Sequence, residues 1–137
     1  MTSLVLDASA VLRFLDNEAG AELIENLLNR ARAREVVLHI SAVNWGEIIY
    51  AIARAHGSSA ARQADANLAA LPVTVAACTA REAAAAGLLK EKYKIPYADA
   101  FAAVLAIQLG AALVTADFDF KSIPGDDLKV QFLPAKP

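Results

Sequence analysis

Near its start the chain reads Leu4-Val5-Leu6-Asp7-Ala8-Ser9-Ala10, a short apolar run that ends at an aspartate. Consecutive apolar residues without polar alternation are typical of a strand buried on both faces, as in a parallel sheet. Val11, Phe14 and Leu15 follow at helical spacing, so we expect a helix to begin almost immediately after the strand. A strand that leads directly into a helix is the repeating step of α/β folds.

The same alternation continues along the rest of the chain. Helices are expected at 22–34, 42–55, 59–69, 80–93 and 96–110, and strands at 36–40, 73–75 and 113–115, with an edge strand around Val130. Ser41 and Thr79 are placed to cap helices, and Gly57 and Gly110 to end them. Alternating strands and helices predict an α/β fold with a parallel sheet covered on both faces. No linker divides the chain, so one domain spanning 1–137 is expected.

Composition narrows the class of protein. Hydrophobic residues make up 57% of the 137 residues and charged residues 20%, which excludes a disordered polymer. No apolar stretch is long enough to cross a bilayer, and no export signal is recognisable, so a soluble cytoplasmic protein without membrane contact is expected. The net charge of −2 disfavours a passive nucleic-acid binder. It disfavours a nuclease less, because bound cations reverse the sign of an acidic pocket.

Four acidic residues occupy positions that such a sheet would bring to one rim. Asp7 ends the first strand, and Asp117 follows the last clear strand by two residues. Ligands of open α/β sheets bind beyond the carboxyl ends of the strands, so both point to the same edge. Glu47 interrupts an otherwise apolar helix, and Asp99 lies among alanines in the first turn of another, with no cation one turn away.

Each of these acids also has a purely structural interpretation. Asp7 is placed to cap a helix, and Asp99 suits the macrodipole at a helix start. Glu47 would be solvated if its helix face is exposed, and Asp117 and Asp119 are common turn residues. The joint placement is harder to explain structurally than any one of the residues.

Clustered carboxylates repel one another and raise one another's pKa values, and a divalent cation resolves that conflict. Ligation by oxygen alone selects Mg²⁺ or Mn²⁺ over zinc. Such a cation activates water and holds a phosphate oxygen, so a phosphodiester is the natural substrate.

Other chemistries fit the sequence poorly. His39 and His56 have no third ligand in register, Ser9 lacks a nucleophile-elbow setting, and no Gly-rich phosphate loop is present. A phosphoaccepting receiver domain would need an acceptor at the end of a middle strand, where this chain has Ala76-Ala77.

Four segments resemble, in the correct order, the motifs of PIN-domain nucleases. They are Leu4-Val5-Leu6-Asp7-Ala8-Ser9-Ala10, Ser41-Ala42-Val43-Asn44-Trp45-Gly46-Glu47, Pro96-Tyr97-Ala98-Asp99-Ala100 and Leu113-Val114-Thr115-Ala116-Asp117-Phe118-Asp119-Phe120. One such match would be weak, but four in sequence cover nearly the whole chain. The short length makes the chain look like a VapC-type toxin of a toxin–antitoxin pair.

The resemblance implies a three-layer α/β/α sandwich around a central parallel sheet. It implies an endoribonuclease that uses Mg²⁺ or Mn²⁺ to activate water and cleave RNA, and a homodimer neutralised by a cognate antitoxin. It assigns the metal to Asp7, Glu47, Asp99 and Asp117. Asp119 is a further candidate ligand, and which of Asp117 and Asp119 lies closer to the metal stays open. The alternative is a catalytically silent PIN-like module that binds RNA or protein.

Supporting roles are expected for three further residues. The hydroxyls of Thr115 and Ser9 would orient a metal ligand or a water. Arg13, nearly two turns beyond Asp7, is the best candidate to guide the RNA backbone at the rim. Trp45, Ile49 and Tyr50 cannot share one narrow helix face, so part of this surface is expected to receive an antitoxin segment or a second subunit.

Overall fold

Five strands form the centre of the computed structural model, which describes residues 1–137. Their order in the sheet is β3-β2-β1-β4-β5, and all neighbours are parallel. The strands are β1 (Thr2–Leu6), β2 (Val36–Ser41), β3 (Val73–Ala76), β4 (Ala112–Thr115) and β5 (Val130–Phe132). The apolar run at the start of the chain is therefore the central strand, between β2 and β4.

Six helices connect the strands, because parallel neighbours need a crossover. They are α1 (Ala8–Leu15), α2 (Ala21–Arg32), α3 (Ala42–His56), α4 (Ser58–Ala69), α5 (Ala80–Tyr93) and α6 (Tyr97–Leu109). The expected turn after β4 is a short 3₁₀ helix, η1 (Phe118–Ser122). Ser41 caps α3, a capping box opens α5, and α3 and α6 end at Gly57 and Gly110, as predicted.

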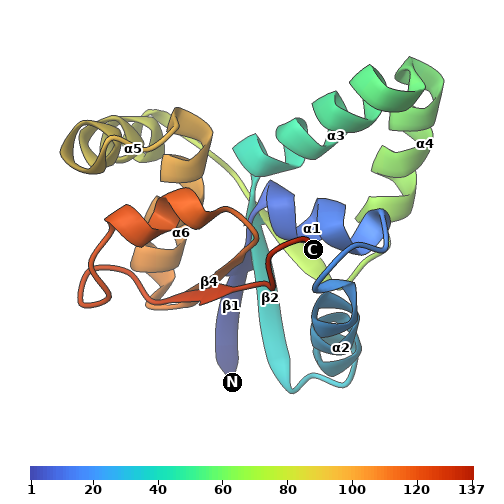
Figure 1. Cartoon of the computed structure of the whole chain (residues 1–137), viewed down its shortest axis with the longest axis horizontal. Coiled ribbons are helices and arrows are strands. Elements are labelled where there is room, and N and C mark those ends of the chain that lie inside the picture. The colour runs from blue at the N-terminus through green and yellow to red at the C-terminus, as the bar shows by residue number, and fades with distance from the viewer.

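The sheet separates two apolar cores, so the predicted three-layer α/β/α sandwich is confirmed (Figure 1). Successive residues of β1 point to opposite faces: Val5 joins the core formed with α5, α6 and η1, and Leu6 joins the core formed with α1 and α2. Alanines dominate the buried face of α6, which lets this helix pack closely on the strands. None of the helices combines the length and apolarity that a bilayer crossing requires.

The carboxyl edge of the sheet is where α1 and α3 begin and where α3 and α4 extend beyond the strands (Figure 1). Helix α6 starts at this edge and returns the chain to the opposite end of β4. The segments that carry the four predicted acids therefore converge at one rim.

Candidate functional site

Asp7 is almost completely buried at the end of β1, with 3% of its surface exposed. Its Oδ1 accepts the backbone N–H of Ala10 at 3.0 Å and so caps α1, and it also accepts the hydroxyl of Ser9 at 2.7 Å. Its Oδ2 accepts the hydroxyl of Thr115 at 2.5 Å. Burial raises the pKa of Asp7 to about 6, although these three hydrogen bonds oppose the increase.

Ser9 and Thr115 connect Asp7 to the turn that follows β4. The register of β1 and β4 pairs Leu6 with Val114, which places Thr115 beside Asp7 at the next step. While each hydroxyl donates to the Asp7 carboxylate, Ser9 Oγ accepts the N–H of Ala116 and Thr115 Oγ1 accepts the N–H of Asp117, both at 2.9 Å. The two hydroxyls thus hold two predicted site residues in a defined relative position.

Asp99, in the first turn of α6, is the most perturbed acid of the site. Burial and the neighbouring Asp117 carboxylate raise the pKa of Asp99 to about 8, with smaller contributions from Asp7 and Glu47. Its Oδ2 is buried and has no hydrogen-bond partner. A buried carboxylate oxygen without a donor is costly, so this atom has a strong requirement for a proton or a cation.

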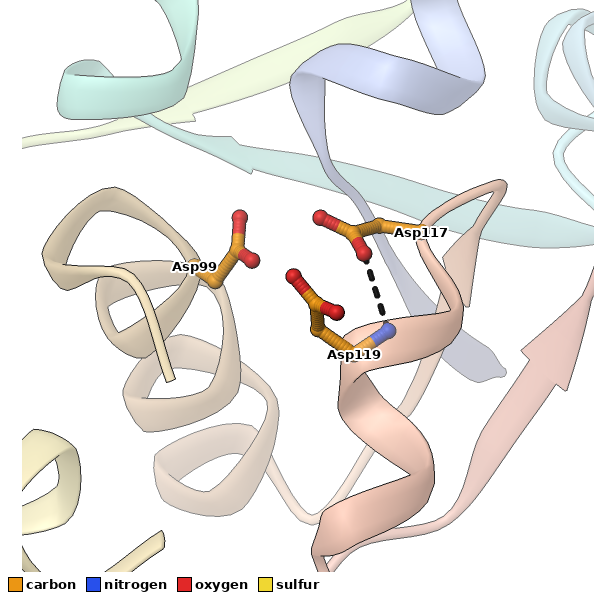
Figure 2. Close-up of side chains that lie close together, drawn as sticks. All are labelled: Asp99, Asp117 and Asp119. Atoms are coloured by element: carbon orange, nitrogen blue, oxygen red, sulfur yellow. Dashed lines mark hydrogen bonds between the residues drawn. The ribbon is translucent and has the colours of Figure 1, made fainter. Parts of the chain in front are cut away.

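Asp117 and Asp119 face Asp99 from the other side of the site (Figure 2). Asp117 caps η1 by accepting the N–H of Asp119 at 2.9 Å, which turns both side chains toward α6. One carboxylate oxygen from each of the three aspartates lies within 4.8 Å of the others. Asp117 is partly buried and Asp119 is exposed, so Asp119 lies at the outer side of the cluster.

Glu47 reaches the site from α3 and is positioned by a residue that the sequence analysis missed. Asn44, one turn earlier and 1% exposed, donates to Glu47 Oε1 at 2.9 Å and to the Ala98 carbonyl at 3.1 Å. It thereby joins α3 to the start of α6, next to Asp99. Asn44 precedes Glu47 by three residues, and this helical spacing could have indicated that the two side chains interact. The contact with Ala98 depends on tertiary packing and cannot be recognised from the local sequence.

Several of these side chains line a pocket of about 250 Å³, whereas Asn44, Thr115 and Asp119 do not. The four predicted acids Asp7, Glu47, Asp99 and Asp117 all contribute to its wall, and no Lys, Arg or His does. An all-oxygen donor set with an unpaired buried carboxylate oxygen fits a hard divalent cation such as Mg²⁺ or Mn²⁺. Asp99 and Asp117 belong both to this pocket and to the cluster with Asp119.

Arg13 does not face the rim, which corrects the expectation that it guides RNA. Its side chain is buried, and its guanidinium donates to the carbonyl oxygens of Ala19 at 2.7 Å and Pro134 at 2.8 Å. The C-terminal segment crosses α1 here and covers Arg13. This tertiary contact between distant parts of the chain makes Arg13 a structural residue.

The apolar surface expected on α3 is smaller than predicted. Trp45 and Ile49 pack against the core on the α1 and α2 side, and the Trp45 indole donates to Asp65 of α4 at 2.8 Å. Only Tyr50 is largely exposed. Helix α4 therefore covers most of the face that was expected to receive a partner.

Comparison with known proteins identifies the family and the fold. The family model described as PIN domain matches residues 4–126. The chain belongs to the PIN domain family. No curated protein sequence matches this PIN domain.

Solved structures resemble the PIN domain over nearly its whole length. VapBC2 from Rickettsia felis, bound to a DNA fragment from its promoter, has a TM-score of 0.73 at 19% identity and covers 97% of this chain and 100% of that one. DNA-bound VapBC from Salmonella typhimurium has a TM-score of 0.71 at 17% identity, with coverages of 96% and 98%. VapC20 from Mycobacterium tuberculosis, described as a sarcin–ricin loop cleaving toxin, has a TM-score of 0.69 at 19% identity, with coverages of 96% and 99%. At these identities the similarity establishes the fold.

Proposed function

We propose that this PIN domain is an Mg²⁺- or Mn²⁺-dependent endoribonuclease and the toxin of a type II toxin–antitoxin pair. Asp7, Glu47, Asp99 and Asp117 would hold the cation, and Asp119 would contribute from the outer side of the cluster. The substrate would be RNA, and a cognate antitoxin would neutralise the toxin.

The observation that supports this proposal most strongly is the lack of charge compensation in the pocket. Four carboxylates line it without a basic side chain, and Asp99 Oδ2 is buried without a donor. Burial and the neighbouring carboxylates raise the pKa of Asp99, and an arrangement that costs stability in this way is typical of a functional site. A divalent cation would satisfy the unpaired oxygen and the repulsion together.

The residues of the chain would divide the work as follows. When bound, the cation supplies a water of lowered pKa and a contact to a phosphate oxygen. Asp7 is held by Ser9 and Thr115, so its carboxylate is already oriented before loading. Asn44 holds Glu47 in the same way. Asp99, whose pKa of about 8 leaves it mostly protonated at pH 7, would release that proton when the cation binds.

The toxin role rests on the structural neighbours. One neighbour is described as a toxin–antitoxin complex from Klebsiella pneumoniae, and VapC20 is described as a sarcin–ricin loop cleaving toxin. These neighbours support an antitoxin as the protein partner and a loop of folded RNA as the class of substrate.

Cleavage of RNA with and without metal tests the proposal. The purified protein should cut a mixed-sequence single-stranded RNA internally in Mn²⁺ and lose the activity in EDTA. Asp99→Asn should reduce the rate at least a hundredfold, whereas Asp126→Asn, an exposed acid outside the pocket, should cleave like the parent. RNA binding without cleavage in Mn²⁺ would contradict the proposal and favour a catalytically silent binding module.

A further inference from the structure

Two exposed aromatic side chains are neighbours of the site acids, one in the pocket wall and one in the chain, and a cation lies beside each of them. Tyr50 of α3 lines the pocket with the acids and is 64% exposed, and the Arg54 guanidinium lies 5.7 Å from the centre of its ring. Phe118 of η1 stands between Asp117 and Asp119 in the chain and is 38% exposed. The Lys121 ammonium lies 5.0 Å from the centre of the Phe118 ring.

Helical spacing produces both pairs. Tyr50 and Arg54 are separated by four residues on α3, and Tyr50 is three residues after Glu47, so all three share one helix face. Phe118 and Lys121 are separated by three residues on η1, where a 3₁₀ helix aligns side chains. Tyr50 therefore lies on the same helix face as Glu47, and Phe118 directly follows Asp117 in the chain.

The Phe118 ring is supported from one side only. It stacks on Phe132 of β5 with ring centres 5.4 Å apart and an angle of 30° between the rings. The Lys121 ammonium is nearly equidistant from the two rings, at 5.0 Å and 5.7 Å, so it lies beside the stacked pair and not on the outer face of Phe118. Phe132 therefore supports the partly exposed Phe118 ring, to which another planar group can be added.

The two pairs lie on different elements of the fold. Tyr50 belongs to α3 and lines the pocket, and Phe118 opens η1 directly after Asp117. An RNA strand that reached from Tyr50 to Phe118 would pass Asp117, which lines the pocket with Tyr50 and directly precedes Phe118 in the chain.

The negative charge of the pocket explains why RNA binding needs aromatic and cationic side chains around the acids. Carboxylates repel the phosphates of RNA, so affinity for the polymer must come from groups around the acids. Proteins that bind single strands combine cations for the backbone with aromatic rings on which unpaired bases stack. One such combination of ring and cation is Tyr50 with Arg54. The other is Phe118 with Lys121.

We propose that these two aromatic–cation pairs bind the nucleotides that flank the phosphodiester in the acid pocket. One unpaired base stacks on Tyr50 and another on Phe118, while Arg54 and Lys121 contact the adjoining phosphates. The ligand is an unpaired stretch of RNA, because a base inside a duplex does not offer a free face. This inference rests on the proposed ribonuclease function and adds the recognition of its substrate.

Fluorescence of 2-aminopurine, which is quenched when the base stacks, tests the inference without requiring catalysis. A short single-stranded RNA carrying this base is titrated with Asp99→Asn protein, which prevents cleavage. Adding Tyr50→Ala or Phe118→Ala should weaken binding about tenfold and reduce the quenching, since one stacked base is lost. Tyr50→Phe and Phe118→Tyr keep a ring and should bind like the Asp99→Asn protein. Arg54→Gln should lower the slope of log affinity against log salt by about 0.7.

Two controls separate stacking from general damage. Leu15→Ala removes the side chain of an apolar residue at the end of α1 that is 40% exposed and lies outside the pocket, and it should leave RNA binding unchanged. A fully paired duplex of the same sequence should bind the ring variants as it binds their parent. Equal losses for duplex and single strand, or none for either ring variant, would overturn the inference. It would also be overturned if Tyr50→Ala altered the oligomeric state and left RNA binding intact, because the ring would then serve a protein contact.

The proposed function and this inference fail in different ways. If the otherwise native Tyr50→Ala and Phe118→Ala proteins cleave RNA in Mn²⁺ with unchanged KM, the ribonuclease proposal stands and the stacking inference is wrong. If the native chain does not cleave although the rings quench the probe, the ribonuclease proposal is wrong and the binding surface stands.

Discussion

Asp7 performs a structural role and a site role with the same carboxylate. It caps α1 through Oδ1 and faces the acid pocket, where Thr115 donates to its Oδ2. Sequence alone presents these roles as competing interpretations, whereas the structure combines them. A substitution of Asp7 therefore alters the helix cap and the pocket together. Asp99 is a cleaner probe, because the N-cap of α6 is Pro96.

The metal-free protein should lose stability as pH rises. The pKa of Asp99 is about 8 in the folded chain against an ordinary value of 3.8, so the folded state holds more protons between about pH 4 and pH 8. The free energy of unfolding then falls as pH increases through this window, and Asp7 adds the same sign up to about pH 6. After allowance for water in the partly exposed pocket, we expect a loss of roughly 2 kcal/mol between pH 5 and pH 9 in EDTA.

Replacing Asp99 isolates its share of this effect. Asp99→Asn should match the parent near pH 4 and unfold at higher urea concentrations than the parent near pH 9. Asp126→Asn, an exposed control, should keep the slope of the parent. Parallel pH profiles for the parent and Asp99→Asn would show that Asp99 does not sit among interacting carboxylates.

The Thr115 hydroxyl should contribute more to the free energy of unfolding than its small size suggests. It is fully buried, donates to Asp7 and accepts the N–H of Asp117. Thr115→Val keeps the shape but leaves both partners short of a hydrogen bond, at a cost of about 2–3 kcal/mol in urea unfolding. Thr74→Val, in the exposed part of β3, should change stability by less than about 0.5 kcal/mol. Equal effects at the two positions would contradict the network that we describe.

At the scale of helices and strands, the features with local causes were predictable. Ser41, Thr79, Gly57 and Gly110 mark helix ends because capping depends on residues within one turn. Asp7 and Asp117 were predicted at one rim because parallel strands end at the same edge. Asn44 was missed, and the packing of Trp45 was underestimated, because both depend on which helix lies opposite α3. The path of the C-terminal segment over Arg13 is likewise set by tertiary packing.

Replacement of Arg13 should therefore lower the stability of the protein and leave RNA binding unchanged. Arg13→Gln removes the guanidinium that joins α1 to the Ala19 and Pro134 carbonyls, and we expect a loss of about 2 kcal/mol in urea unfolding. The KM for single-stranded RNA should stay within about twofold of the parent, because the side chain is buried away from the substrate. Arg32→Gln, on the exposed face of α2, is the matched control and should change neither quantity. A raised KM without a loss of stability would restore Arg13 as an RNA contact.

At the scale of the whole molecule, the parallel topology gathers acids that are far apart in the chain. The Asp7 and Asp117 carboxylates lie 110 residues apart in sequence yet line one pocket, because β1 and β4 are neighbours in the sheet. An apolar core packs against each face of the sheet, so the strand ends that carry the site are held in position from both sides. The acid pocket and the arrangement of the two aromatic–cation pairs around it therefore exist only in the folded protein.

The isolated chain is expected to form a homodimer. Helices α5 and α6 expose Leu88, Ile107 and Leu109, and a contact between two copies that buried these side chains would remove apolar surface from water. Sedimentation equilibrium at micromolar concentration should give twice the mass of one chain. Leu88→Lys should shift the equilibrium toward the monomer because it places a charge in the contact. A monomeric parent protein at these concentrations would contradict the expectation.

The proposed ribonuclease chemistry requires that the acid pocket bind a divalent cation, and titration calorimetry with Mn²⁺ measures this directly. The parent should bind Mn²⁺ at pH 7 and release protons on binding, because the raised pKa of Asp99 leaves that group protonated before loading. Asp99→Asn should bind at least tenfold more weakly. No binding by the parent, or equal affinity in the two proteins, would contradict the account.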